Sequence, residues 1–102
     1  MSKKYPVVTG VLDYFPLAIR EVARLSKLGS EKHNPGEPMH WAREKSDDHP
    51  NSLGRHLMLR GTVDKEDGVR HSVKVAWRAL AMAEMELEEA EREREKSSEE
   101  GG

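Results

Sequence analysis

The clearest hydrophobic pattern lies between residues 69 and 87, where apolar side chains recur at alternating intervals of four and three. This spacing predicts a helix with a narrow apolar stripe that packs against other helices, formed by Val69, Val73, Ala76, Leu80, Ala83 and Leu87. A second group projects onto the opposite face of the same helix, namely His71, Val75, Arg78 and Met82, with Trp77 between the two faces. A chain this small rarely covers one helix on both faces, so we expect a homo-oligomer with this helix near an interface.

Two shorter helices precede this one. Apolar residues at helical spacing and Pro16 in a first turn predict a helix over about residues 15–28, ended by Gly29. A second helix is expected to begin near Ser46 or Asp48 and to end at Arg60 before Gly61. Between them, a segment rich in proline and glycine predicts a loop.

The two ends of the chain differ from this helical middle. Residues 1–12 include a β-branched stretch from Val7 to Leu12 that favours a short strand or an extended arm. Residues 91–102 are charged, so we expect the last helix to fray before Ser97 and the tail to be disordered. The predicted fold is therefore all-α, a small three-helix chain with an extended N-terminal arm and a helical domain over 13–90, which packs into a helical-bundle homo-oligomer.

Composition limits the class of function. Hydrophobic and charged residues each make up 35% of the 102 residues, which predicts a thin core. Seventeen Lys and Arg nearly balance nineteen Asp and Glu, so the net field favours neither a nucleic-acid polymer nor an anionic membrane. The chain has no cysteine and no apolar run long enough for a signal or a membrane span, so we expect a soluble protein of the cytoplasm.

The composition of the loop from Glu31 to Arg43 predicts that it binds something. It carries His33, His40, Trp41 and charges of both signs. A tryptophan in a loop exposes a large apolar ring to water, so it needs something to pack against. A loop that only joined two helices would not need these side chains.

Several polar residues lie at the edges of apolar stripes. Glu21 borders the stripe of the first helix, and an acid there calls either for a metal ion or for an arginine from elsewhere in the bundle. His56 lies between Leu53 and Leu57 in projection, where a hydrogen-bonded packing role is the more frequent one. Arg55 lies further round, where a solvated charge is more frequent than a substrate clamp.

The acidic residues near the helix starts allow two interpretations, helix capping and metal binding. Helix capping explains Asp48 and Asp67 without any metal, and we favour that explanation. However, Asp67 precedes His71 by four residues, with Lys74 and Arg78 further along the same helix. Carboxylate and imidazole can hold a divalent ion, while Lys and Arg can hold phosphate oxygens. No spacing typical of zinc and no phosphate-binding glycine motif is present, so a nucleotide would be held by side chains between helices.

An ordered series of short motifs resembles a known family. The motifs are Gly10-Val11-Leu12-Asp13-Tyr14-Phe15-Pro16, Glu21-Val22-Ala23, Gly29-Ser30-Glu31-Lys32-His33-Asn34, His40-Trp41, Arg55-His56-Leu57, Asp67-Gly68-Val69-Arg70-His71 and Ala76-Trp77-Arg78-Ala79-Leu80. From about Val7 to Leu87 the chain resembles the phage-associated dATP/dGTP diphosphohydrolase-like domain, which is similar to the all-α nucleoside triphosphate pyrophosphatases of the MazG type. The resemblance implies an all-helical oligomer that binds a purine nucleoside triphosphate and, with Mg²⁺, cuts it to a monophosphate and pyrophosphate.

The resemblance also implies roles for individual residues. The metal-side acids would be Glu21, Glu31 and Asp67. The catalytic residues would be Glu21, His56 and His71, and the substrate-binding residues would be Lys32, His33, Trp41, Arg43, Arg55, Lys74 and Arg78. Phosphoanhydride hydrolysis needs charge neutralisation and a positioned water, which suits this set. MazG-type enzymes gather metal on a Glu-Glu-x-x-Glu run, whereas here Glu21 stands alone in that place.

Two functional classes therefore remain open. The first is a phage nucleotide hydrolase that acts on purine deoxynucleotides. The second is a non-catalytic binder that sequesters a nucleotide, for example a signalling nucleotide of a host defence system, because a basic pocket with few acids suits capture. A purely structural oligomer is the third and plainest alternative.

Overall fold

The computed structural model describes residues 4–45 and 48–101, and the described chain is almost wholly helical. A π-helical turn η1 (Val8–Leu12) leads to α1 (Pro16–His33), a 3-10 turn η2 (Arg43–Lys45), α2 (His49–Met58) and the long α3 (His71–Gly101). The described residues form no named strand, only an isolated bridge between Val63 and Arg70. The predicted all-α class is confirmed.

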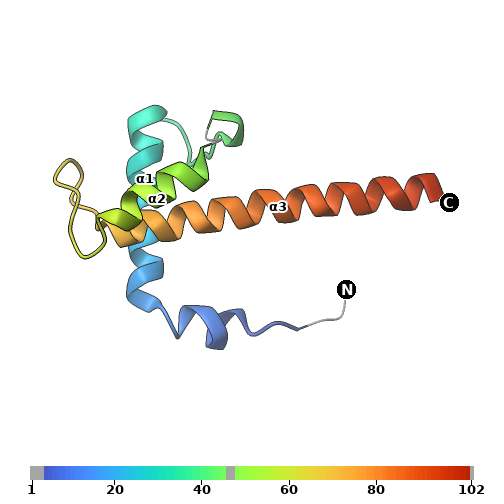
Figure 1. Cartoon of the computed structure of the whole chain (residues 1–102), viewed down its shortest axis with the longest axis horizontal. Coiled ribbons are helices and arrows are strands. Elements are labelled where there is room, and N and C mark those ends of the chain that lie inside the picture. The colour runs from blue at the N-terminus through green and yellow to red at the C-terminus, as the bar shows by residue number, and fades with distance from the viewer. Residues whose placement is uncertain (1–3, 46–47, 102) are drawn as a thin grey trace.

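The three main helices meet at the first half of α3. Figure 1 shows α1 and α2 gathered around this half, while the rest of α3 extends away from them. The buried apolar side chains of the described chain are Val69, Val73 and Ala81, so the core is as thin as composition predicts. The face with His71 and Arg78 is covered by α2, whereas the apolar stripe on the other face is buried only at its start. Leu80 and Leu87 of that stripe remain exposed.

Helix α1 is longer than the sequence pattern predicts. The predicted stop at Gly29 is wrong, because the helix passes through Gly29 and ends at His33. Gly29 does not adopt the left-handed conformation of a helix-ending glycine. The residue after the helix is Asn34, whose φ of -138° lies outside the helical region. Pro35 explains this end, since a proline disfavours helical backbone in the residue before it.

The N-terminal region also differs from the prediction. The expected extended arm over residues 1–12 is wrong for Val8–Leu12, which form a helical turn, whereas residues 4–6 have no regular secondary structure. The Asp13 amide donates to the Val8 carbonyl at 2.8 Å, and the Gly10 amide donates to the Pro6 carbonyl at 2.7 Å. These local hydrogen bonds outweigh the weak extended preference of the β-branched residues. Residues 1–3 lie outside the described chain.

Helix α2 and the turn after it follow the predicted pattern closely. The predicted start at Ser46 lies outside the described residues, and Asp48 precedes the first residue of α2. Its carboxylate accepts a hydrogen bond from the Asn51 side chain at 2.9 Å rather than from a helix amide. The helix ends two residues before Arg60, and Gly61 follows with a φ of +86°, a conformation that favours glycine.

The C-terminal tail continues α3. The predicted fraying before Ser97 is wrong, since the helix runs to Gly101. Ion pairs three residues apart join Glu89 to Arg92 and Glu91 to Arg94. Such pairs, together with the high helix propensity of Glu, Arg and Lys, support a helix that no other element covers. No helix in the described chain combines the length and the apolar character that crossing a bilayer requires.

Candidate functional site

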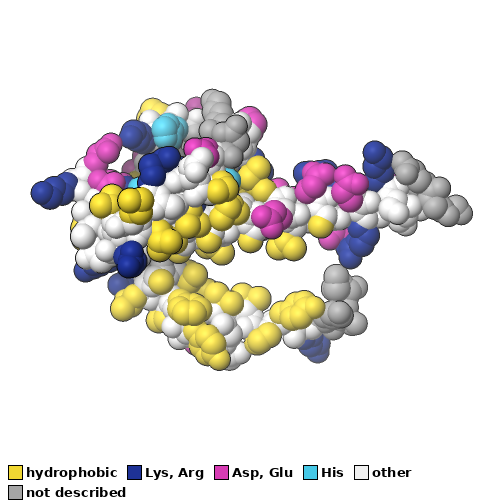
Figure 2. Space-filling model, viewed as in Figure 1, with side chains coloured by type: hydrophobic (Ala, Val, Ile, Leu, Met, Phe, Trp, Pro, Cys, Tyr) yellow, Lys and Arg dark blue, Asp and Glu magenta, His cyan; other side chains and the backbone are white. Residues whose placement is uncertain are grey.

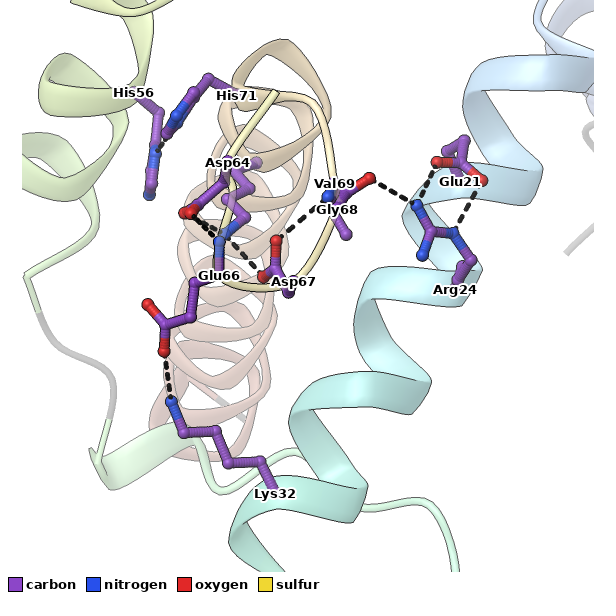
Figure 3. A network of polar contacts seen from close by, with 11 residues as sticks. Glu21, Arg24, Lys32, His56, Asp64, Glu66, Asp67, Gly68, Val69 and His71 are labelled. Atoms are coloured by element: carbon purple, nitrogen blue, oxygen red, sulfur yellow. Dashed lines mark hydrogen bonds and ion pairs between the residues drawn. The ribbon is translucent and has the colours of Figure 1, made fainter. Parts of the chain in front are cut away.

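Two histidines from different helices form a direct pair at the centre of the α2–α3 contact. The Nδ1 atoms of His56 and His71 lie 2.9 Å apart, and the ring centroids are separated by 5.1 Å (Figure 3). These two distances place the nitrogens between the rings, so each nitrogen faces the other as in an N–H···N hydrogen bond. His71 is buried and His56 is half-buried. One of the two Nδ1 atoms must therefore act as acceptor.

A lysine on α3 holds two carboxylates of the preceding turn. The Lys74 Nζ lies 2.8 Å from Asp64 Oδ2 and 2.7 Å from Asp67 Oδ2, and the lysine side chain is only 13% exposed. Burial acts to lower the pKa of Lys74, but the hydrogen bonds to the two carboxylates raise it above its usual value. The same hydrogen bond lowers the pKa of Asp64. Asp67 also accepts the Val69 amide at 3.0 Å, so both carboxylates are ionised and the turn is fixed to α3.

The turn is fixed on its other side by α1. Figure 3 shows Glu21 and Arg24 facing each other, with Arg24 reaching the backbone at Gly68. Both guanidinium–carboxylate hydrogen bonds measure 2.9 Å, and Arg24 donates to the Gly68 carbonyl at 3.1 Å. The hydrogen bond from Arg24 lowers the pKa of Glu21. Of the two explanations left open for Glu21, the described structure shows an arginine partner, although one on its own helix.

Aromatic rings form a second cluster beside the histidine pair. Trp41 packs its edge against Trp77 of α3, with ring centroids 5.6 Å apart, and His49 lies 6.5 Å from Trp41. Trp77 Nε1 donates to Ser26 Oγ at 2.8 Å, which ties the cluster to α1. The expectation that the loop tryptophan needs a packing partner is thus met inside the chain.

Two arginines flank the aromatic cluster. The Arg43 guanidinium lies 4.2 Å from the centre of the Trp41 ring and donates two hydrogen bonds to Glu88. Arg78 lies 5.6 Å from the centre of the Trp77 ring, and its Nη1 is 3.0 Å from His49 Nδ1. Trp41 Nε1 is buried and has no hydrogen-bond partner among the described residues. The cluster therefore presents arginine and indole side by side.

Positively charged side chains of α2 and α3 lie close together near the histidine pair and the aromatic cluster. We call the surface that carries Arg55, His56 and Arg78 the α2–α3 face. Burial lowers the pKa of His56, and the charges of Lys74, His71 and Arg78 lower it further. Burial likewise lowers the pKa of Arg78, with a second contribution from the charge of Arg55. The helices thus bring two predicted site residues, Lys74 and Arg78, into electrostatic range of His56, and Arg55 into range of Arg78. Asp64 and Asp48 offset part of this positive charge. An anion placed here would relieve this repulsion.

Other predicted site residues lie apart from this face. Lys32 pairs with Glu66 at 3.4 Å, where both side chains are exposed. His33 is exposed at the end of α1. Glu31 is also exposed, beside a shallow surface pocket lined with Lys27, Ser30, Glu37 and Met39. Glu31 follows Glu21 by ten residues, which is about 15 Å along a helix. Glu21 and Glu31 therefore do not share one site.

The donor set can be tested for Mg²⁺. In the described chain no three side chains of the His, Asp and Glu type come together to hold an ion. The acids nearest the histidine pair, Asp64 and Asp67, already face an ammonium group. Mg²⁺ is usually held by one or two carboxylates together with substrate phosphates. The described residues do not by themselves form a magnesium site, so the predicted trio of Glu21, Glu31 and Asp67 does not fit the ion as a preformed set.

The sequence reasoning missed three residues of this region. His49 and Trp77 complete the aromatic cluster, and Asp64 supplies the second carboxylate on Lys74. The indole of Trp77 was assigned to no partner because its neighbours come from the loop and α1, far away in sequence. Sequence spacing alone does not indicate Asp64, because its contact with Lys74, ten residues later, depends on how the turn bends back.

The histidine pair gives a testable pH dependence. Because the pKa of His56 is lower in the folded chain, the unfolded chain binds more protons below about pH 6.5. Stability should therefore fall as the pH decreases from the unfolded pKa through the folded pKa of His56. Urea unfolding between pH 5 and pH 7.5 measures this slope. A His56→Asn variant should show a shallower slope, and an unchanged slope would contradict this role of His56.

These features define a class of protein: an all-α chain with a cationic and aromatic site between two helices. The chain matches the family model described as dATP/dGTP diphosphohydrolase, N-terminal, over residues 2–95, and it belongs to that family. No curated protein and no solved structure matches it significantly.

Proposed function

We propose that the chain binds a purine deoxynucleoside triphosphate on the α2–α3 face. The triphosphate would lie against Arg55, His56 and Arg78, with the base or sugar near Trp41. The observation that carries this proposal is the grouping of these cationic side chains, where burial lowers the pKa values of His56 and Arg78 and neighbouring positive charges lower them further. A phosphate chain bound there would reduce this repulsion.

We further propose that the bound nucleotide is hydrolysed to a monophosphate and pyrophosphate, as the family description suggests. His56 has a lowered pKa, so it is neutral near pH 7 and suited to accept a proton from an attacking water. Arg78 and Arg55 would neutralise the charge on the leaving pyrophosphate. Mg²⁺ would arrive with the nucleotide phosphates, and we assign no step to the ion because no group of three acidic or histidine side chains in the described part of the chain is placed to hold it.

The alternative is a binder that sequesters a nucleotide without cutting it. One observation favours it, namely that Lys74 already forms ion pairs with the carboxylates of Asp64 and Asp67, near the histidine pair. Few acids then remain near the site to organise a metal ion and the attacking water. In either case we propose a homo-oligomer that acts in the cytoplasm, in a phage-infected host if the chain is phage-encoded.

The experiment is incubation with dATP or dGTP and Mg²⁺, followed by measurement of pyrophosphate and of the thermal shift. Pyrophosphate release that is lost in His56→Asn supports hydrolysis. A nucleotide-dependent rise in Tm without pyrophosphate supports the binder, because a ligand that binds only the folded state stabilises it. Neither product nor thermal shift with either nucleotide would overturn both proposals.

A further inference from the structure

The apolar stripe of α3 continues well beyond the part that the chain covers. Leu80 is 54% exposed and Leu87 is 66% exposed, and Ala83 and Ala90 on the same face are exposed as well. We call the face formed by Ala76, Leu80, Ala83, Leu87 and Ala90 the α3 seam. Its residues alternate between small and large at intervals of four and three, which is the pattern of helix-to-helix packing. In the described chain, nothing fills this pattern.

The N-terminal segment, residues 4–15, shows a second uncovered apolar surface. Its seven large hydrophobic residues are between 41% and 71% exposed, and they are Tyr5, Val7, Val8, Val11, Leu12, Tyr14 and Phe15. Figure 2 shows hydrophobic side chains both on this segment and on the side of α3 that faces it, with open space between them. Monomeric soluble proteins rarely leave apolar surface of this extent in water.

We propose that a second copy of this chain fills the space, with the two α3 seams packed against each other and each N-terminal segment covering the α3 of the other copy. This deepens the homo-oligomer of the proposed function and does not depend on nucleotide binding. A stable interface buries about 800 Å² on each partner. Each buried aromatic side chain contributes roughly 150–250 Å², so the three aromatic residues of the N-terminal segment and the seam leucines together reach that order of area.

A second copy fits the seam better than an unrelated partner because the seam complements itself. The leucines of the two helices can pack against each other, while the small alanines between them let the two backbones approach closely. The thin core points the same way, since Val69, Val73 and Ala81 are the buried apolar residues of the described chain. Association with an identical chain supplies the missing apolar burial.

Charge decides the direction of the pairing. Residues 84–95 of α3 carry seven glutamates against two arginines, whereas residues 71–83 carry no acid. A parallel pair would place the two acidic halves beside each other, but an antiparallel pair places each acidic half beside a half without acids. An antiparallel pair centred between Ala83 and Glu84 brings Leu80 opposite Leu87 of the second copy.

The first test compares two leucines of nearly equal exposure. Light scattering after gel filtration should give the wild-type chain a mass of about twice 11.6 kDa. Leu80→Glu should shift the mass towards 11.6 kDa, whereas Leu59→Glu, at a position 51% exposed at the end of α2, should leave the dimer intact. Circular dichroism shows whether each variant keeps its helices. A monomeric wild-type chain, or equal effects of the two substitutions, would overturn the proposal.

The second test uses the absence of native cysteine. Chains with Leu80→Cys and chains with Leu87→Cys are mixed and oxidised, and a mixed disulfide dimer is expected. Leu80→Cys alone should not cross-link, because an antiparallel pair centred between Ala83 and Glu84 separates the two positions by about 10.5 Å along the helix axis, beyond the reach of a disulfide. Cross-linking of Leu80→Cys alone without the mixed product would show a parallel pair and overturn the proposal. Both measurements need no nucleotide, so their failure is distinguishable from a failure of the proposed function.

Discussion

Replacing Lys74 by methionine is expected to lower the free energy of unfolding by about 2 kcal/mol. The lysine is 13% exposed and holds Asp64 and Asp67 at 2.8 and 2.7 Å. Methionine preserves much of the side-chain volume but removes the charge, which leaves two ionised carboxylates facing each other. Urea denaturation at pH 7 measures the loss.

Two further variants separate the ion pairs from general surface effects. Lys65→Met changes an exposed lysine of the same turn and should alter stability by less than about 0.5 kcal/mol. Lys74→Met combined with Asp64→Asn and Asp67→Asn should recover part of the loss, because no unpaired charge then remains. Equal losses for Lys74→Met and Lys65→Met would show that the two carboxylates do not depend on Lys74.

The sequence pattern predicts the helices better than their ends. Apolar spacing identifies α1, α2 and α3 because burial of one face is a local property of each segment. The end of α1 was misplaced because Gly29 looks like a stop, while the decisive residue is Pro35, which acts on Asn34. The charged composition of the tail predicts disorder because it offers nothing to bury, but its glutamate and arginine pairs sustain a helix.

The candidate site was harder to predict because its contacts join distant segments. His56 and His71 were both selected from sequence, but their direct pairing depends on how α2 crosses α3. Lys74 was expected to face phosphate, whereas it binds Asp64 and Asp67 across the turn. Residue type and spacing indicate which side chains can carry chemistry. Only the packing of the helices determines which of them meet.

The interpretation of Trp41 shows the same limit. A tryptophan in a proline-rich loop predicts a packing partner, and that part is correct. Sequence alone could not choose between a ligand and the chain itself, since Trp77 lies on a helix 36 positions later. In the structure the two indoles lie against each other, with Arg43 over the outer ring. A nucleotide near Trp41 would therefore meet a ring that is already held in place.

Replacing Arg78 or Arg55 by glutamine is expected to weaken the binding of dATP and dGTP by about tenfold each, because each loses one charge-assisted hydrogen bond to phosphate. Calorimetric titration of the wild-type chain and of each variant measures this change. The matched control is Arg20→Gln on α1, which changes an exposed arginine outside the proposed site and should leave the affinity unaltered.

Stability provides the more specific signature of an anion site. Burial lowers the pKa of Arg78, and the charge of Arg55 lowers it further, although Asp48 acts in the opposite direction. Arg55→Gln should therefore leave the Tm without nucleotide unchanged or higher, while the rise in Tm caused by nucleotide becomes smaller. A structural role for Arg55 predicts the opposite, a lower Tm without nucleotide and an unaltered affinity. Wild-type affinity in both Arg55→Gln and Arg78→Gln would remove the α2–α3 face as the phosphate site.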